Sequence, residues 1–124
     1  MMYFEMDCPC KGKNLDKMLQ PAILLELYDE DLHGFMLIQK LSRNPMFDGN
    51  MPDKAGVYRY LKKMEASGLL QSDWELDDEG GKPRRIYSIT DNGKQCLVNW
   101  TMALKQYTRS VDKLVDKIDK KIGI

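Results

Sequence analysis

Four cations lie between positions 54 and 63, and no acidic residue lies among them. Lysine and arginine at this density attract phosphate groups, and arginine can also form paired hydrogen bonds with a base edge. Helical periodicity over 53–67 places these cations opposite an apolar face of Val57, Leu61 and Met64, with Tyr60 beside them. We therefore interpret the segment as a helix that lies in the major groove of a duplex. Its candidate DNA-binding residues are Lys54, Gly56, Tyr58, Arg59, Lys62 and Lys63.

Gly56 lies on the cationic face of this helix, where it costs about 1 kcal/mol relative to alanine. Close approach of the helix to a phosphate backbone would offset that cost, because glycine lacks a side chain. The alternative is an ordinary helix with a solvated basic face. A second basic element directly downstream makes that alternative less favourable.

That second element is a predicted hairpin with strands over 69–76 and 84–90. Gly80 and Gly81 permit a tight reversal, and the cations Lys82, Arg84 and Arg85 follow it. Arginine in such a place suits contact with a phosphate backbone or a narrow minor groove. Five acids on the outgoing strand and turn leave a charge-balanced surface hairpin as the alternative. We expect the base of the hairpin to pack on the helices through Leu70, Trp74, Ile86 and Ile89.

Two further helices are expected to support these elements. The first begins at Leu15 with Asn14 as its cap, and is kinked or restarts at Pro21, where the backbone lacks a donor. A turn over 29–32 leads to a second helix over 33–43, with Phe35, Ile38 and Leu41 facing inward. Before and after the cationic helix, Asp53 is a plausible cap and Gly68 a plausible left-handed terminator.

A long helix is predicted over 91–122, capped by Thr90. Its apolar residues recur at alternating spacings of three and four, which defines a heptad seam. Such a long seam favours a partner helix, most simply that of a second copy, although it could instead pack within one chain. A two-fold dimer would favour an inverted-repeat site on DNA. The seam consists of Leu97, Trp100, Leu104, Tyr107, Val111, Leu114 and Ile118.

Length and composition are those of one small domain: 124 residues, 43% hydrophobic and 31% charged. The formal net charge is zero, which argues against coating of nucleic acid by bulk charge but not against a local basic patch. We expect a loose arm over 1–13, a DNA-binding domain over 14–90 and a dimerisation helix over 91–124. No secretory signal or membrane span is recognised, so we expect a cytoplasmic protein.

Three stretches of the chain resemble the PadR family of bacterial transcriptional regulators. They are LHGFMLIQKL (32–41), VYRYLKKMEASGLL (57–70) and SDWELDDEGGKPRRIYSITDNGKQCL (72–97). The resemblance covers roughly positions 15–104, and the order and spacing of the motifs are more specific than any one of them. The Cys-Pro-Cys arm and the residues after it also look like a subgroup of polyhydroxybutyrate-responsive repressors.

The resemblance implies a mainly α fold: a winged helix-turn-helix of three helices and a two-stranded wing, followed by a long dimerisation helix. It implies a homodimeric repressor of transcription, similar to the family's short branch. Tyr58 matches the tyrosine of the recognition helix, whereas Gly56 and Arg59 depart from the family's usual threonine and proline. The matching wing residues are Gly80, Gly81, Lys82, Arg84, Arg85 and Tyr87.

Other chemistry has little support in the sequence. There is no nucleophile–base pair, phosphate-binding glycine loop or paired-carboxylate site, so we expect no enzyme activity, catalytic residue or cofactor. His33, the single histidine, is expected to cap or support the second helix. Cys8 and Cys10 either form an inert tail or, paired in a dimer, bind a soft metal or sense oxidation; we assign no metal site.

Two aromatic residues of the seam, Trp100 and Tyr107, have two interpretations. They either pack in the dimer interface or, as in the family's multidrug-sensing members, line a pore for a flat apolar effector. The predicted function is thus a dimeric, sequence-specific DNA-binding regulator, a repressor released by a small apolar or aromatic effector. The alternative is a winged-helix interaction module that binds an acidic protein partner.

Overall fold

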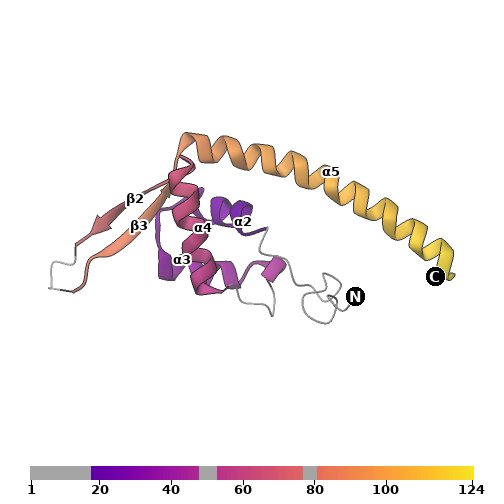
Figure 1. The fold of residues 1–124 in the computed structure, drawn as a ribbon, viewed down its shortest axis with the longest axis horizontal. Coiled ribbons are helices and arrows are strands. Elements are labelled where there is room, and N and C mark those ends of the chain that lie inside the picture. Colours follow the sequence, from indigo (N-terminus) through magenta and orange to yellow (C-terminus); the bar gives the residue numbers. More distant parts are fainter. Residues whose placement is uncertain (1–17, 48–52, 77–80) are drawn as a thin grey trace, which may run out of the picture.

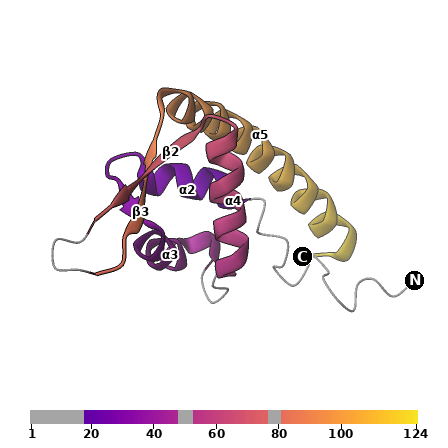
Figure 2. The ribbon, with the colours of Figure 1, turned by 60° about the vertical axis from the view of Figure 1, so that its left-hand side comes forward.

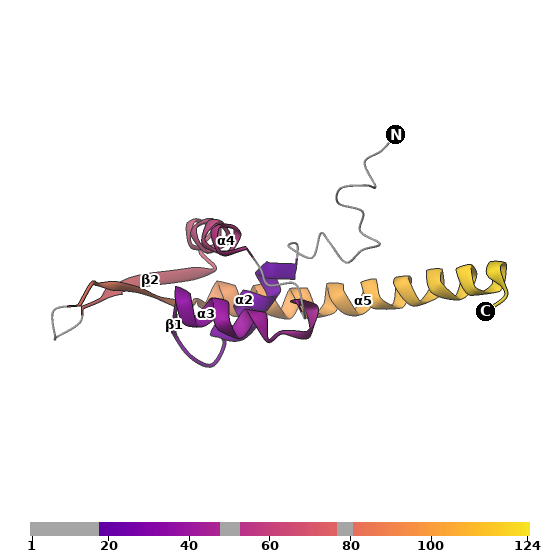
Figure 3. The same ribbon diagram turned by 90° about the horizontal axis from the view of Figure 1, so that it is seen from below.

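The computed structural model describes residues 18–47, 53–76 and 81–124 (Figure 1). Helices α2, α3 and α4 form a cluster from which a β-hairpin and the long helix α5 project in opposite directions (Figures 1 and 3). Figure 2 shows the three clustered helices beside the base of the hairpin. The elements in chain order are α2 (Leu19–Leu27), β1 (Leu32–His33), α3 (Gly34–Ser42), a 3₁₀ turn (Pro45–Phe47), α4 (Lys54–Ala66), β2 (Leu70–Glu75), β3 (Arg84–Ile89) and α5 (Asp91–Ile122).

The core lies where the three clustered helices meet. Helix α2 contributes Ile23 and Leu24, whose side chains are fully buried, because it is apolar on nearly all sides. Pro21 lies in its first turn, where a backbone N–H has no partner within the helix, so the predicted place of Pro21 near the first turn of a helix is confirmed. The predicted start at Leu15 and its cap Asn14 lie outside the described residues.

Helix α3 faces the core differently from the sequence-based expectation. Ile38 and Leu41 are buried as predicted, but Phe35 is 59% exposed, so its inward placement was wrong. Leu37 is fully buried and takes the inward position instead. The residues before α3 also differ from the expected turn, because Leu32 and His33 form the short strand β1.

The sheet has three antiparallel strands in the order β1-β3-β2, which adds one short strand to the expected two-stranded wing. Its base packs on the helices through Leu70 and Tyr87, which are buried, and Ile89, which is partly buried. Ile86 was expected among these residues, but it is opposed to Asp73 and His33 on the other face of the sheet. Trp74 was also expected to pack on the helices but is 61% exposed. By this position β2 has extended beyond the helices, so no core is available to cover the indole.

A junction around Thr90 connects α4, the sheet and α5. The hydroxyl of Thr90 accepts a hydrogen bond from the Gly93 amide at 3.0 Å and donates one to the Gly68 carbonyl at 2.6 Å. Gly68 has a φ of 82°, so both the predicted cap and the predicted left-handed terminator are confirmed. Asp53 holds the N-cap position of α4, but its side chain makes no capping hydrogen bond.

The same junction requires glycine at position 93. A Cβ atom there would overlap the Leu69 carbonyl oxygen and lie 2.7 Å from the Ile89 side chain. We expect Gly93→Ala to lower the free energy of unfolding by about 1–3 kcal/mol, as overpacking does. Urea unfolding followed by circular dichroism measures this loss.

Gly56→Ala is the matched control, because a Cβ at position 56 would have its nearest neighbour at 3.6 Å. It should raise the free energy of unfolding by about 0.5–1 kcal/mol. A Gly93→Ala protein as stable as the original chain would contradict this account of the junction.

Candidate nucleic-acid interface

Helix α4 presents its cations on a surface that the rest of the chain leaves open. Val57, Leu61 and Met64 are buried, as the periodicity predicted. The candidate side chains Lys54, Tyr58, Arg59, Lys62 and Lys63 are all exposed.

The ion pairs found among residues 18–47, 53–76 and 81–124 are His33–Glu75 and Glu30–Lys40. The cations of α4 therefore have no carboxylate partner within this part of the chain. These exposed cations are therefore available to bind an external anion.

Packing within the chain does not explain the glycine in α4. A Cβ at Gly56 would lie 3.6 Å from the Arg59 guanidinium and 3.8 Å from Asp53, which are ordinary contact distances. Alanine would therefore fit the isolated chain and would favour the helix. Gly56 is partly buried on the cationic side, where an absent side chain lets another body approach the backbone.

Tyr58 is held against the start of α3. A Cβ at Gly34 would lie 2.7 Å from Cε1 of Tyr58 and 2.8 Å from its hydroxyl oxygen, so glycine at position 34 leaves room for the ring. The tyrosine remains 45% exposed. Sequence reasoning missed Gly34 as a functional residue, and its signal was the His-Gly pair at the start of the second predicted helix.

The wing cations Lys82, Arg84 and Arg85 are also exposed, as is Gly81; Gly80 lies outside the described part of the chain. The Arg85 guanidinium lies over the indole of Trp74, with 4.9 Å between its Cζ atom and the ring centroid. These two residues are directly opposed across β2 and β3. Sequence reasoning placed Trp74 in the core, so this pair was missed.

His33 occupies the N-cap position of α3, but its side chain makes no capping hydrogen bond. Its Nε2 atom instead lies 3.1 Å from Oε1 of Glu75 on β2. The predicted place of His33 at the cap of the second helix is therefore confirmed, although its side chain does not make the capping hydrogen bond. The imidazole joins the short strand β1 to the far strand of the hairpin.

Tyr87 lies next to the wing cations at the base of the hairpin. Burial raises the pKa of its hydroxyl above the usual value, and the nearby positive charge of Arg85 acts in the opposite direction. The folded state therefore holds the Tyr87 proton more tightly than the unfolded state does. The protonated hydroxyl contributes its full share of stability below the unfolded-state pKa, and this share is lost as the pH rises through the folded-state pKa. At neutral pH the hydroxyl is therefore protonated.

The seam of α5 divides into two parts. Leu97, Trp100 and Leu104 are partly buried, and the first two pack against the core of their own chain. The indole N–H of Trp100 donates a hydrogen bond at 2.7 Å to Oε1 of Gln20 on α2, a contact that no sequence pattern signalled. The remaining seam residues, Tyr107, Val111, Leu114 and Ile118, are exposed.

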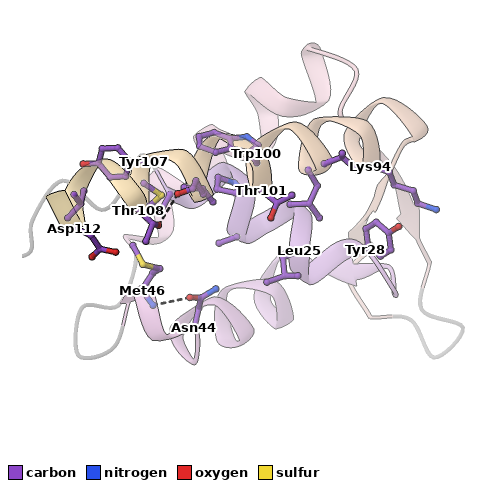
Figure 4. Close-up of a pocket in the computed structure, with 17 residues that line it drawn as sticks. Leu25, Tyr28, Asn44, Met46, Lys94, Trp100, Thr101, Tyr107, Thr108 and Asp112 are labelled. Carbon is purple, nitrogen blue, oxygen red and sulfur yellow. Dashed lines mark hydrogen bonds between the residues drawn. The ribbon is translucent and has the colours of Figure 1, made fainter.

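A groove of about 750 Å³ lies between α5, α2 and the segment after α3 (Figure 4). Figure 4 shows Trp100 and Tyr107 on the α5 side and Leu25, Asn44 and Met46 on the other. The groove contains both aromatic residues of the predicted effector site. Its lining is mainly apolar, and its polar members include Lys94, Thr101, Thr108 and Asp112.

The described part of the chain offers neither a metal site nor a membrane-spanning helix. Residues 18–47, 53–76 and 81–124 contain no group of three or more metal-ligating side chains. In the same ranges, no helix combines the length and apolar composition that a membrane span requires. Cys8 and Cys10 lie outside the described residues.

A helical cluster with an exposed cationic helix, an adjacent antiparallel wing and a long terminal helix defines a winged-helix DNA-binding protein. The chain belongs to the transcriptional regulator PadR-like family, whose model matches residues 23–99. It is therefore a DNA-binding transcriptional regulator, and the family is generally not enzymatic. The family model does not distinguish subgroups, so membership of the polyhydroxybutyrate-responsive subgroup stays a prediction.

Solved structures agree with this assignment. A proposed transcriptional regulator of Thermoplasma acidophilum is 26% identical with a TM-score of 0.71, and the match covers 82% of this chain and 94% of that one. A PadR family regulator of Eggerthella lenta is 26% identical (TM-score 0.63; 75% and 80% covered). A PadR-like regulator of Bacillus cereus, 23% identical, shares the fold (TM-score 0.67; 82% and 94% covered). No curated protein matches the chain.

Proposed function

We propose that the protein is a homodimeric transcriptional repressor that binds an inverted-repeat operator and is released by a small apolar or aromatic effector. The observation that carries the proposal is the row of exposed cations on α4, which have no carboxylate partner in the described chain, beside a basic wing. A surface with this charge and helical shape fits the major groove of a duplex.

The two basic elements have different roles in this proposal. Arg59 contacts base edges, because arginine can bind guanine through two hydrogen bonds, and Tyr58 flanks it. Lys54, Lys62 and Lys63 neutralise phosphates, and Gly56 allows the backbone of α4 to approach them. The wing cations Lys82, Arg84 and Arg85 contact the backbone beside the groove.

The proposed contacts predict two kinds of mutational effect on DNA affinity. Arg59→Ala should reduce preference for the operator by about 1–3 kcal/mol at one base position. Lys62→Ala should weaken operator and random duplex alike, and should reduce the slope of log affinity against log salt by about 0.9. Fluorescence anisotropy at several salt concentrations, with DNA from upstream of the protein's own gene, measures both effects.

The exposed Lys105 of α5 supplies the control, since Lys105→Ala should leave the affinity and the slope unchanged. Binding that is independent of salt would contradict the proposed interface. Strong binding of poly-glutamate, with no binding of either duplex at low salt, would favour the alternative of an interaction module for an acidic protein.

The dimer interface is proposed on the exposed part of the α5 seam. Tyr107 and Leu114 are 62% and 58% exposed, and Ile118 is 48% exposed, which is unfavourable for side chains of this size in water. Pairing with a second α5 would cover them along the heptad spacing. A two-fold arrangement would also fix the separation of the two α4 helices.

A charge within the seam should weaken this dimer. Leu114→Lys should convert the dimer to monomer at micromolar concentration, because pairing would bury two ammonium groups without partners. Sedimentation velocity measures the change. Gln106→Lys adds the same charge outside the seam and should leave the dimer intact; a monomeric original chain would refute the proposal.

The groove beside Trp100 is the proposed effector site. Its volume of about 750 Å³ falls in the range typical of small-molecule sites, and aromatic side chains stack well on flat ligands. The hydrogen bond from Trp100 to Gln20 fixes the indole as one wall. An effector here would contact α2, which packs against α4 in the core.

The effector site can be tested with the fluorescent probe 1-anilinonaphthalene-8-sulfonate in a Trp74→Phe background, in which Trp100 is the remaining tryptophan. Binding should quench Trp100, and Tyr107→Ala should weaken it several-fold because one aromatic wall is lost. Met102→Ala is the control, since this exposed residue of α5 lies outside the groove. Probe binding unaffected by Tyr107→Ala, or without effect on DNA affinity, would refute the assignment.

A further inference from the structure

The two faces of the hairpin differ in chemistry. One face carries Leu70, Ser72 and Trp74 of β2, which are opposed by Ile89, Tyr87 and Arg85 of β3. At its base this face packs on the helices, because Leu70 and Tyr87 are buried and the Ser72 hydroxyl donates a hydrogen bond at 2.8 Å to Glu65 of α4. Side chains alternate along a strand, so Trp74 and Arg85 continue the α4 side of the hairpin beyond the core.

The opposite face is acidic. It carries Asp73 and Glu75 of β2, with Arg84 directly opposed to Glu75. The Glu75 carboxylate lies against His33 of β1. Arg84 therefore projects among carboxylates on the side away from α4, where a phosphate is repelled more than on the other face.

Trp74 has no structural reason to be large and aromatic within the described chain. Its side chain is 61% exposed and contributes nothing to the core. Its partner is Arg85, whose guanidinium lies over the indole with 4.9 Å between Cζ and the ring centroid. A stacked guanidinium uses its flat face for the ring and keeps its N–H edges available for hydrogen bonds.

We propose that Trp74 is a positioning residue of the DNA interface, which holds the Arg85 guanidinium on the α4 side of the wing so that Arg85, rather than Arg84, is the principal phosphate contact of the hairpin. The inference rests on the proposed DNA-binding mode and deepens it. Both arginines are exposed. Because they are consecutive residues of β3, their side chains lie on opposite faces of the strand, and this difference in position distinguishes them.

The proposed advantage is preorganisation. A free arginine loses rotamer freedom when it binds a phosphate, and stacking restricts that freedom before DNA arrives. Tyr87 lies two residues from Arg85 along β3, so both side chains are on the same face of the strand. Arg85 thus shares its face with two aromatic side chains and stacks on one of them, whereas no aromatic ring of the described residues stacks on Arg84.

The test is a double-mutant cycle on DNA affinity, measured with the full chain and a random duplex at low salt. Arg85→Ala should weaken binding several-fold more than Arg84→Ala. Trp74→Ala should weaken it about 2–5-fold, which corresponds to a cation–π contact at an exposed site. The same change in an Arg85→Ala background should have no further effect, because Trp74 acts through the arginine.

Two conservative variants separate stacking from bulk. Trp74→Phe keeps a weaker aromatic face and should retain part of the affinity, whereas Trp74→Leu keeps apolar bulk and should behave as Trp74→Ala. Circular dichroism should show all variants folded, since the indole is outside the core. If Trp74→Ala fails to fold, the comparison of Trp74→Phe with Trp74→Leu still decides the question.

Lys62→Ala distinguishes failure of this inference from failure of the proposed function. If Lys62→Ala leaves DNA affinity unchanged, the binding mode itself is wrong. If Lys62→Ala weakens binding but the losses at Trp74 and Arg85 are additive, Trp74 does not position Arg85. An Arg84→Ala loss equal to or larger than that of Arg85→Ala would likewise overturn the inference.

Discussion

The arrangement of this molecule depends on the junction at Thr90. One hydroxyl there caps α5 through the Gly93 amide and also donates to the carbonyl of Gly68 at the end of α4. The Thr90 amide itself donates to the Leu69 carbonyl at 3.1 Å. These bonds join the end of the cationic helix, the hairpin and the start of α5 within a few residues, so a change in the direction of α5 would act on both basic elements of the proposed DNA-binding surface.

A second connection joins α5 to α2 beside the groove. Trp100 is joined to α2 through Gln20, and α2 buries Ile23 and Leu24 in the same core as Leu61 of α4. A ligand in the groove would contact α2 and α5 together. It would therefore act on both the angle of α5 and the support of α4, which is a physical route from the proposed effector to DNA affinity.

Periodicity was sufficient to predict the parts of the fold that local spacing and local residue preferences determine. The apolar face of α4, the bounds of α5 and the cap at Thr90 follow from spacing and from residues with strong local preferences. The errors arose where tertiary context decides. Phe35 and Trp74 are large and apolar, so both were expected in the core. Phe35 instead lies on the outer face of α3, whose Leu37 faces the core, and β2 carries Trp74 beyond the helices.

Other features had no sequence signal because they depend on partners far apart in the chain. The Gln20–Trp100 hydrogen bond joins residues separated by 80 positions, and the strand β1 is two residues long. The Arg85–Trp74 pair required the register of the hairpin, which a loop of several residues leaves undetermined. Residue types could therefore identify the candidate DNA-binding set, but not which arginine of the wing has an organised geometry.

A protein with zero net charge can bind a polyanion only if its charges are segregated, and the hairpin shows how this is achieved on a small scale. Strand alternation places Asp73 and Glu75 on one face, with Arg84 among them, and Arg85 on the other face with the cationic helix. The acids thus lower the net charge of the chain, and they act more strongly on their own face than on the α4 side. They also make the other side of the wing unfavourable for phosphate, so a duplex that approaches from the wrong side is repelled.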